Sequence, residues 1–357
     1  MSIPQVIRTR LTELTGVDHP IVQTGMGWVS GARLVSATAN AGGLGFLASA
    51  TMTIEELERS IEEVLERTDR PFGVNLRADA GDASARAELL IRKGVKVASF
   101  ALAPKRELIE KLKEHGIVVI PSIGAVRHAE KVAAWGADAV MIQGGEGGGH
   151  TGAIPTSILI PSVVSAVDIP VIAAGGFYDG RGLASALASG AVGIGMGTRF
   201  LLTSDSAVPD EIKRRYLEAD LAGTVVTTKA DGMPHRLLRT EFITELEQQS
   251  GVKHLLSTAR RSLEFKKLSG LSWPEFVRDG AAMKQASGRS LAQMALAANT
   301  PMLLKAGLVD GDTQAGMLAA GQVVGLIDDL PSCDELITRT VREAAGYLTA
   351  AAALLVH

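Results

Sequence analysis

Short apolar segments recur at a steady interval along the first half of this chain, and segments with helical patterns lie between them. Such alternation is typical of a parallel sheet whose strands are joined by helical crossovers. Eight strand–helix units of roughly 20 to 30 residues favour a sheet closed into a barrel. We therefore predict an α/β fold, a TIM-type (β/α)8 barrel. Its strands are expected at 21–25, 44–48, 72–76, 97–102, 117–123, 139–144, 171–176 and 191–197.

The helical pattern is clearest at 54–65, where apolar residues from Ile54 to Val64 recur at three- and four-residue spacing. Thr53 precedes this segment and Glu56 follows three residues later, which is the pairing of a capping box. This segment is predicted to be a capped helix. Further helices are expected at 83–93, 105–115, 126–135, 157–167 and 182–189.

An open, doubly wound sheet is the alternative fold for such a pattern, and it places its nucleotide-binding loop after the first strand. Here the glycine-rich loops follow the sixth, seventh and eighth expected strands. A barrel typically builds its phosphate site after strands 7 and 8. The distribution of glycine therefore favours the barrel.

Charge and cysteine content exclude several functional classes. A formal charge of −3 provides no basic field to hold a nucleic-acid backbone, and a single cysteine, Cys333, excludes an internal disulfide and a multi-cysteine metal site. The N-terminus lacks an apolar signal core, and the apolar tail at 344–356 is shorter than the roughly 20 residues of a membrane span. We expect a cytoplasmic protein without metal, membrane or nucleic-acid partners, whose tail is a packed helix and a candidate homodimer surface.

The strand repeat stops after Leu202, and the chain from 204 to 299 is richer in charge. We predict a barrel formed by 1–203 and 300–357, with an inserted helical domain at 204–299 that binds substrate or forms a lid. Basic residues gather in this insert, which suits either an anionic substrate or a solvated helical face. They are Lys213, Arg214, Arg215, Arg236, Arg239, Lys253, Arg260, Arg261, Lys266 and Lys267.

Two loops carry residues suited to a flat ligand. Gly25 and Gly27, on either side of Met26, would let the main chain lie against a planar ring, although a tight turn uses the same residues. Asn75 ends the third expected strand, and its amide both donates and accepts, as a flavin pyrimidine edge requires. A helix cap would use an asparagine there too, so neither loop decides the ligand alone.

Six of the ten residues from Gln143 to Gly152 are glycine. Because each glycine costs conformational entropy, this loop indicates unusual dihedral angles or close contact with a ligand. His150 lies in the loop, on the face where barrel active sites are found. A lone histidine is usually structural, but this one is placed to take a proton near neutral pH. We predict that His150 is the catalytic residue.

The loops after the seventh and eighth expected strands contain Gly175 and Gly176, and Gly197 and Thr198. They offer unobstructed backbone N–H groups, a hydroxyl and a helix N-terminus, which together suit a phosphate. A cradle for one phosphate fits a mononucleotide such as FMN better than a dinucleotide, and the chain has no P-loop motif.

These segments together resemble the nitronate monooxygenase, or 2-nitropropane dioxygenase-like, flavoproteins, a family that includes NAD(P)H:quinone reductases and flavin-type enoyl reductases. The matching pieces are QTGMGW, ANAGGLG, RPFGVNL, GADAVMIQGGEGGGHTG, VIAAGGFYDGRGL, GMGTRFL and AAGQVVGLI. The resemblance implies non-covalent FMN and gives His150 the role of a base. It implies that the cofactor is bound by Gly25, Met26, Gly27, Asn75, Gln143, Gly148, Gly149, Gly175, Gly176, Gly197, Thr198, Gly321 and Gln322.

More narrowly, the segment ending in GGEGGGHTG and the segment DGMPHRLLR resemble an actinobacterial branch of the family linked to steroid-ring degradation. This resemblance implies a bicyclic acyl-CoA thioester as substrate, with Arg236 and Arg239 as candidate contacts to coenzyme A phosphates. His150 would take the α-proton of the thioester while hydride passes to the flavin. Alternatives are nitronate oxidation, NAD(P)H:acceptor or enoyl reduction, and a barrel that binds phosphate ligands without redox catalysis.

Overall fold

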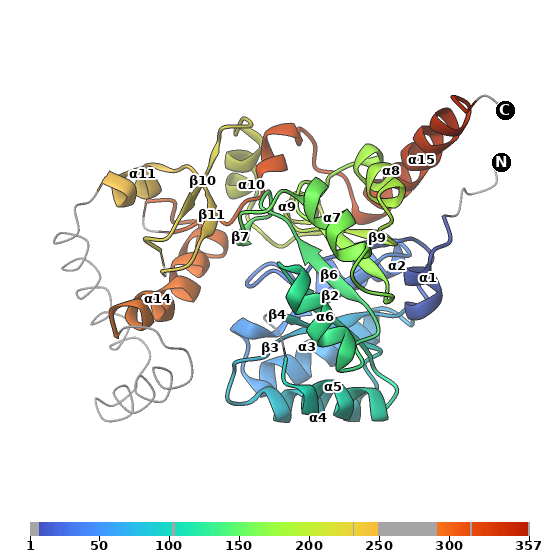
Figure 1. The fold of residues 1–357 in the computed structure, drawn as a ribbon. Helices are drawn as coiled ribbons and strands as arrows, with labels where there is room; N and C mark the ends of the chain where they lie inside the picture. The colour runs from blue at the N-terminus through green and yellow to red at the C-terminus, as the bar shows by residue number, and fades with distance from the viewer. Residues whose placement is uncertain (1–6, 102–103, 231, 249–290, 315, 356–357) are drawn as a thin grey trace.

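The computed structural model describes residues 7–101, 104–230, 232–248, 291–314 and 316–355. Eight parallel strands close into a barrel in chain order, and β9 returns to pair with β1 through Ile21 and Ile194 (Figure 1). The predicted fold class is therefore confirmed. The barrel strands are β1 (Ile21–Gln23), β2 (Leu44–Ala48), β3 (Gly73–Arg77), β4 (Val97–Ala101), β5 (Val118–Ile123), β6 (Val140–Gln143), β8 (Val171–Ala174) and β9 (Gly193–Met196).

Amphipathic helices surround the barrel where their patterns predicted them. In α3 (Ile54–Arg67), Thr53 and Glu56 form the expected capping box, with hydrogen bonds of 2.8 and 3.2 Å between the side chain of each residue and the backbone N–H of the other. The other helices around the barrel are α1 (Arg10–Thr15), α2 (Ala32–Asn40), α4 (Ala83–Lys93), α5 (Arg106–Glu114), α6 (Val126–Ala134), α7 (Thr156–Val164), α8 (Gly180–Ala188) and α9 (Thr198–Leu201).

The core is aliphatic, and it has one layer between strands and helices and another inside the barrel. The inner layer includes Val22, Phe46, Ile120 and Ile172, all of them buried. Phe46 fills space that Gly73 leaves open, because a Cβ on Gly73 would lie 2.3 Å from the Phe46 ring. Side chains therefore fill the barrel, and the ligand site must lie at its mouth.

The insert differs from the prediction. It contains the helices α10 (Asp210–Leu217) and α11 (Glu241–Gln248). It also contains β10 (Thr224–Thr227) and β11 (His235–Leu238), which form an antiparallel ribbon that the prediction of a helical insert did not include. This ribbon also pairs with β7 (Gly149–His150), the short strand of the glycine-rich loop. The predicted boundary at 299/300 falls within α14 (Leu291–Leu308). The basic residues Lys253, Arg260, Arg261, Lys266 and Lys267 lie outside the described residues.

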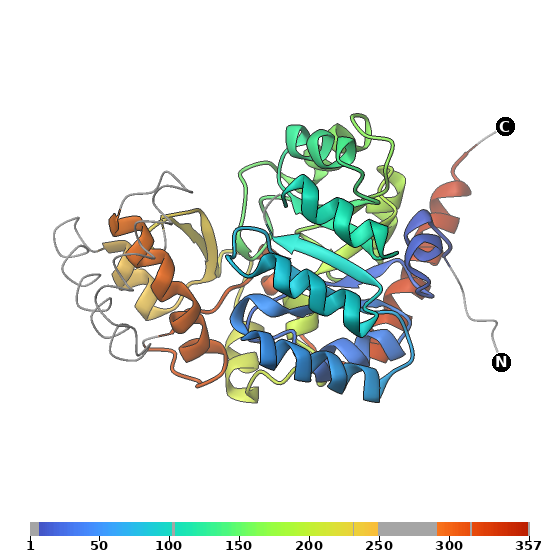
Figure 2. The same cartoon turned by 90° about the horizontal axis from the view of Figure 1, so that it is seen from below.

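The C-terminal helix α15 (Cys333–Ala352) packs against α8 and α2, on the side of the barrel away from the ribbon and α14 (Figures 1 and 2). Its buried residues end at Ala344, whereas Leu354 and Leu355 are 80% and 69% exposed. Among the described residues of the predicted tail, 344–356, Ala344 alone is buried, so the expectation of a packed tail is wrong beyond this residue. Within the described ranges, none of the helices is both long and apolar enough to cross a membrane.

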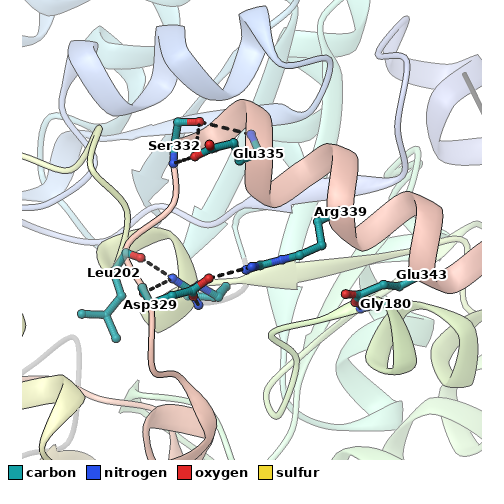
Figure 3. Close-up of polar contacts among 8 residues, drawn as sticks. Gly180, Leu202, Asp329, Ser332, Glu335, Arg339 and Glu343 are labelled. Atoms are coloured by element: carbon teal, nitrogen blue, oxygen red, sulfur yellow. Dashed lines mark hydrogen bonds and ion pairs between the residues drawn. The ribbon is translucent and has the colours of Figure 1, made fainter. Parts of the chain in front are cut away.

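A charged cluster joins α15 to α9 (Figure 3). Arg199, only 2% exposed, donates to the Asp329 carboxylate (2.7 Å) and to its backbone carbonyl (2.8 Å), and Arg339 donates to the other carboxylate oxygen (2.6 Å). Burial alone would raise the pKa of Asp329, but the hydrogen bonds from Arg339 and Arg199 outweigh it and lower that pKa. The cluster therefore fixes α9, the first element after β9.

Candidate active site

The loops after β1, β3 and β9 meet at the carboxyl ends of the strands. A Cβ on Gly25 would lie 2.6 Å from the Cβ of Asn75, so only glycine allows these two loops to touch. The Asn75 amide donates to Ser99 Oγ (3.3 Å), which fixes its orientation. A Cβ on Gly197 would lie 3.4 Å from the sulfur of Met26. The structure thus brings together Gly25, Met26, Asn75 and Gly197, and their role in cofactor binding stays a prediction.

The β1 loop also contacts α14, through a residue that was not singled out from the sequence. Trp28 is the one non-glycine residue with positive φ (65°) in the described chain, a conformation that costs energy and marks a constrained loop. Its indole N–H donates to the Pro301 carbonyl of α14 (2.8 Å). The neighbouring Gly27 faces Thr51 rather than the other loops, because its Cβ would lie 3.2 Å from Thr51 Cγ2.

The glycine-rich loop, residues 143–152, folds around the Gln143 side chain. The Gln143 amide donates to the carbonyls of His150 (2.8 Å) and Gly148 (3.3 Å). Gly147 has no room for a side chain, because its Cβ would lie 2.6 Å from the Gln143 amide nitrogen. Gly149 has φ of 74°, in the left-handed region that favours glycine. These constraints explain the glycine content of the loop and place His150 next to Gln143.

Glu146 anchors the same loop, and the sequence analysis missed it although it is the one charged residue among the six glycines. Its carboxylate accepts from the Thr156 N–H (3.0 Å) and lies 2.7 Å from the Thr156 hydroxyl, at the start of α7. Its backbone carbonyl accepts from the Gln322 N–H (2.9 Å). Glu146 therefore joins the loop to α7 and to the segment before η2 (Gln322–Leu326).

The expected phosphate-binding residues converge on this segment. Gly175 and Gly176 have φ of 98° and 84°, and a Cβ on Gly176 would approach only the Glu146 side chain, at 3.6 Å or more. Thr198 Oγ1 accepts from the Gly321 N–H (2.8 Å). This hydrogen bond joins the start of α9 to the segment of the chain that follows the insert. Because α9 has only four residues, its dipole is small, and backbone N–H groups and the Thr198 hydroxyl are the main anion-binding groups.

His150 lies on β7 with its side chain exposed, and β11 places His235 directly opposite it. The two rings have their centroids 4.6 Å apart and an interplanar angle of 44°. His235 is buried, with 2% of its surface exposed. His235 lies in the segment DGMPHRLLR, but only the arginines of that segment could be recognised as candidates, because nothing in the sequence pairs this strand with the glycine-rich loop.

The two arginines of that segment differ. Arg236 donates to Thr224 Oγ1 and to the Gly145 carbonyl, both at 2.9 Å, and so ties the ribbon to the glycine-rich loop. Burial lowers the pKa of Arg236, and the nearby Glu146 carboxylate partly offsets this effect. Arg239 is exposed, and its backbone N–H donates to the Gly223 carbonyl (2.8 Å). The structure brings Arg236 into the site as a structural group and leaves Arg239 on the surface beside the ribbon.

The comparisons with known proteins agree with this arrangement. The family model described as nitronate monooxygenase matches residues 8–343, which include every loop discussed above. The chain belongs to the nitronate monooxygenase family. It is therefore an enzyme of the oxidoreductase class, and its family membership implies a bound flavin.

Relatives of this nitronate monooxygenase-family chain are similar over its whole length. A protein of Mycobacterium tuberculosis named (3aS,4S,5R,7aS)-5-hydroxy-7a-methyl-1-oxo-octahydro-1H-indene-4-carboxyl-CoA dehydrogenase is 63% identical over 352 residues, 98% of this chain and 99% of that protein. A protein of the same name from Rhodococcus jostii is 62% identical, over 98% and 99% of the two chains. Among solved structures, FabK from Thermotoga maritima has a TM-score of 0.80 at 33% identity and covers 98% of this chain and 100% of that one.

Proposed function

We propose that this enzyme is an FMN-dependent dehydrogenase of a bicyclic, steroid-derived acyl-CoA thioester. The observation that carries the proposal is the 63% identity, over 98% of the chain, to the M. tuberculosis protein whose name states such an activity. That alignment covers 98% of this chain and therefore includes the insert, whereas a 30%-identical relative named as a probable nitronate monooxygenase covers 68% of this chain.

FMN is the proposed flavin because the site offers one phosphate cradle. Gly175 and Gly176 are both in left-handed conformations, and a Cβ on Gly176 would contact the Glu146 side chain at 3.6 Å. The Glu146 backbone carbonyl accepts from Gln322, and the neighbouring Gly321 N–H donates to the Thr198 hydroxyl. Gly25 packs directly against the Asn75 side chain, and as a glycine it adds no side chain of its own that would obstruct a planar ring. The bound flavin would supply the acceptor for the two electrons removed with the substrate's β-hydrogen.

His150 is the proposed base for the α-proton. A thioester carbonyl acidifies this proton, and an exposed imidazole on the mouth of the barrel can reach it. Loss of the α-proton and the β-hydride leaves an α,β-unsaturated thioester. Gln143 holds the His150 carbonyl, so the base is carried on a loop of fixed backbone.

Exposed arginines of the insert suit the remote phosphates of coenzyme A. Arg239 is the leading candidate, because Arg236 already donates to two protein acceptors. An exposed guanidinium beside the mouth would increase binding of a polyanionic substrate and would add little to the chemical step. We also propose that residues 204–299 form a separate substrate-binding unit. The exposed end of α15 is the proposed surface for a homodimer. The proposed location of the protein is the cytoplasm.

The direct experiment is anaerobic mixing of the purified, flavin-loaded protein with each candidate substrate. We expect the bicyclic acyl-CoA thioester to bleach the flavin, and extraction to release FMN. Bleaching by a nitronate alone would instead support nitronate oxidation, which the family membership favours as the second candidate. Bleaching by NADH or NADPH alone would support a reductase, and extraction of FAD would overturn the single-phosphate argument.

A further inference from the structure

A second histidine lies beside the proposed base and has no role in the function described so far. His235 on β11 is the register partner of His150 on β7, and the two rings lie within packing distance of each other, with centroids 4.6 Å apart. Cross-strand neighbours in such a pair interact directly, and aromatic rings at this separation attract one another in tilted arrangements.

The two histidines are held very differently. His235 belongs to the central strand of the three-stranded sheet, between β10 and β7, and its ring nitrogens are inaccessible to solvent. Next to it along β11, Leu237 forms a bridge with Ala319, and Leu238 donates to the Leu318 carbonyl (2.7 Å). His235 is therefore a fixed ring, set by backbone pairing on both sides of its strand.

His150 ends the two-residue strand β7 and follows three consecutive glycines, Gly147, Gly148 and Gly149. The Gln143 contact holds its backbone carbonyl, and the space at the adjacent Gly149 is open, with no atom within 4 Å of a Cβ built there. An exposed imidazole on such a loop needs a fixed surface if its nitrogen is to meet a substrate carbon at one angle.

We infer that His235 is a positioning residue that packs against the His150 imidazole and sets its orientation for proton abstraction. This inference rests on the proposed role of His150 as the base. His235 itself does not contact the reacting atoms.

The test compares His235→Ala, which removes the ring, with His235→Phe, which keeps a ring of similar shape. With the acyl-CoA thioester, we expect His235→Ala to lower kcat roughly 10- to 100-fold and to change KM less than about twofold. His235→Phe should recover most of that loss. His115→Ala is the matched control, because His115 is an exposed histidine that precedes β5, at the opposite end of the barrel, and its replacement should change nothing.

A pair of small substrates separates positioning of the base from a general effect on the site. Nitroethane must lose a proton before oxidation, whereas ethyl nitronate has already lost it. His235→Ala should therefore slow flavin reduction by nitroethane and leave reduction by ethyl nitronate unchanged. Equal loss with both compounds, or loss of kcat in His235→Phe as large as in His235→Ala, overturns the positioning role.

A readout independent of activity distinguishes failure of this inference from failure of the proposed function. In protein with isotopically labelled histidine, the His150 ring resonance, identified by its absence in His150→Ala, should shift in His235→Ala because the neighbouring ring current is lost. If the wild-type enzyme does not oxidise the thioester, the proposed function fails, and the nitroethane comparison and this resonance still decide the role of His235. An unchanged His150 resonance overturns the contact itself.

Discussion

The barrel loops and the inserted ribbon meet at one site, but they contribute different kinds of chemical groups. The barrel side is built from backbone, because Gly25, Gly175 and Gly176 lie where a side chain would clash or would need a left-handed conformation. The ribbon side is built from side chains, with His235 against His150 and Arg236 on the Gly145 carbonyl. The proposed cofactor cradle and the proposed support of the catalytic histidine therefore depend on different parts of the sequence.

This contrast has a practical meaning for substitutions. A backbone-built cradle is damaged by adding a methyl group to glycine, whereas a side-chain-built support is damaged by removing atoms from histidine or arginine. Changes of the first kind should reduce flavin content, and changes of the second kind should reduce turnover of flavin-loaded protein. The following predictions test this separation, from the largest expected effect to the smallest.

Replacement of the proposed base should produce the largest difference between the effect on flavin content and the effect on turnover. His150→Ala should retain flavin and lose turnover by about 10²- to 10⁴-fold, the usual contribution of general acid–base catalysis. Flavin absorbance after gel filtration and steady-state kinetics measure the two properties. Turnover near that of the wild type at every pH would show that His150 is a spectator.

A methyl group in the phosphate cradle should have the reverse effect. Gly176 and Gly136 have similar φ values, 84° and 88°, and a Cβ at either position would find no atom closer than 3.6 Å. Alanine should therefore cost each about 1–2 kcal/mol of backbone strain, since both would be left-handed. Only Gly176→Ala should also lose flavin, with an expected increase in the FMN Kd of at least about tenfold, roughly 1.4 kcal/mol. Equal flavin content in the two variants would remove the cradle from the proposed position.

The two arginines of the insert should give different kinetic results. Arg236→Ala frees the Gly145 carbonyl and should lower kcat with every substrate, by a few-fold to tenfold, because loss of a charged hydrogen bond costs about 1.5–3 kcal/mol locally. Arg239→Ala should raise KM for the acyl-CoA alone, and the salt dependence of that KM should fall because a screened ionic contact is gone. If Arg236→Ala affected the acyl-CoA alone, Arg236 would be a substrate contact after all.

A substitution far from the barrel mouth should have the smallest effect on activity, and it serves as the reference for a change in stability alone. Ser332 caps α15, and its hydroxyl accepts from the Glu335 N–H at 3.2 Å (Figure 3). Ser332→Ala should lower the free energy of unfolding by about 1 kcal/mol, a typical N-cap loss, and leave flavin content and kcat unchanged. Thermal unfolding measures the first quantity. A change in kcat would mean that the packing of α15 against the barrel influences the site. The separation between the barrel side and the ribbon side of the site would then be incomplete.

The sequence was sufficient for the barrel and for most of its mouth, because these depend on local patterns. Ile54 to Val64 show helical spacing, and the glycine-rich segments mark where strands end. The ribbon was missed although Thr224–Thr227 is a run of β-branched residues followed by an Asp-Gly turn signal. Its pairing with a two-residue strand far away in sequence leaves no periodic pattern. For the same reason the position of His235 and the direction of the Arg236 side chain could be known only from the structure.

The pairing of β7 with β11 has a consequence for how the protein matures. All eight barrel strands precede residue 200, whereas β11 and the segment at Gly321 come later in the chain. During synthesis, a nascent chain can therefore close its barrel before the strand that supports His150 has left the ribosome. In refolding from denaturant, recovery of barrel secondary structure should come first, and recovery of activity should follow only when the ribbon docks.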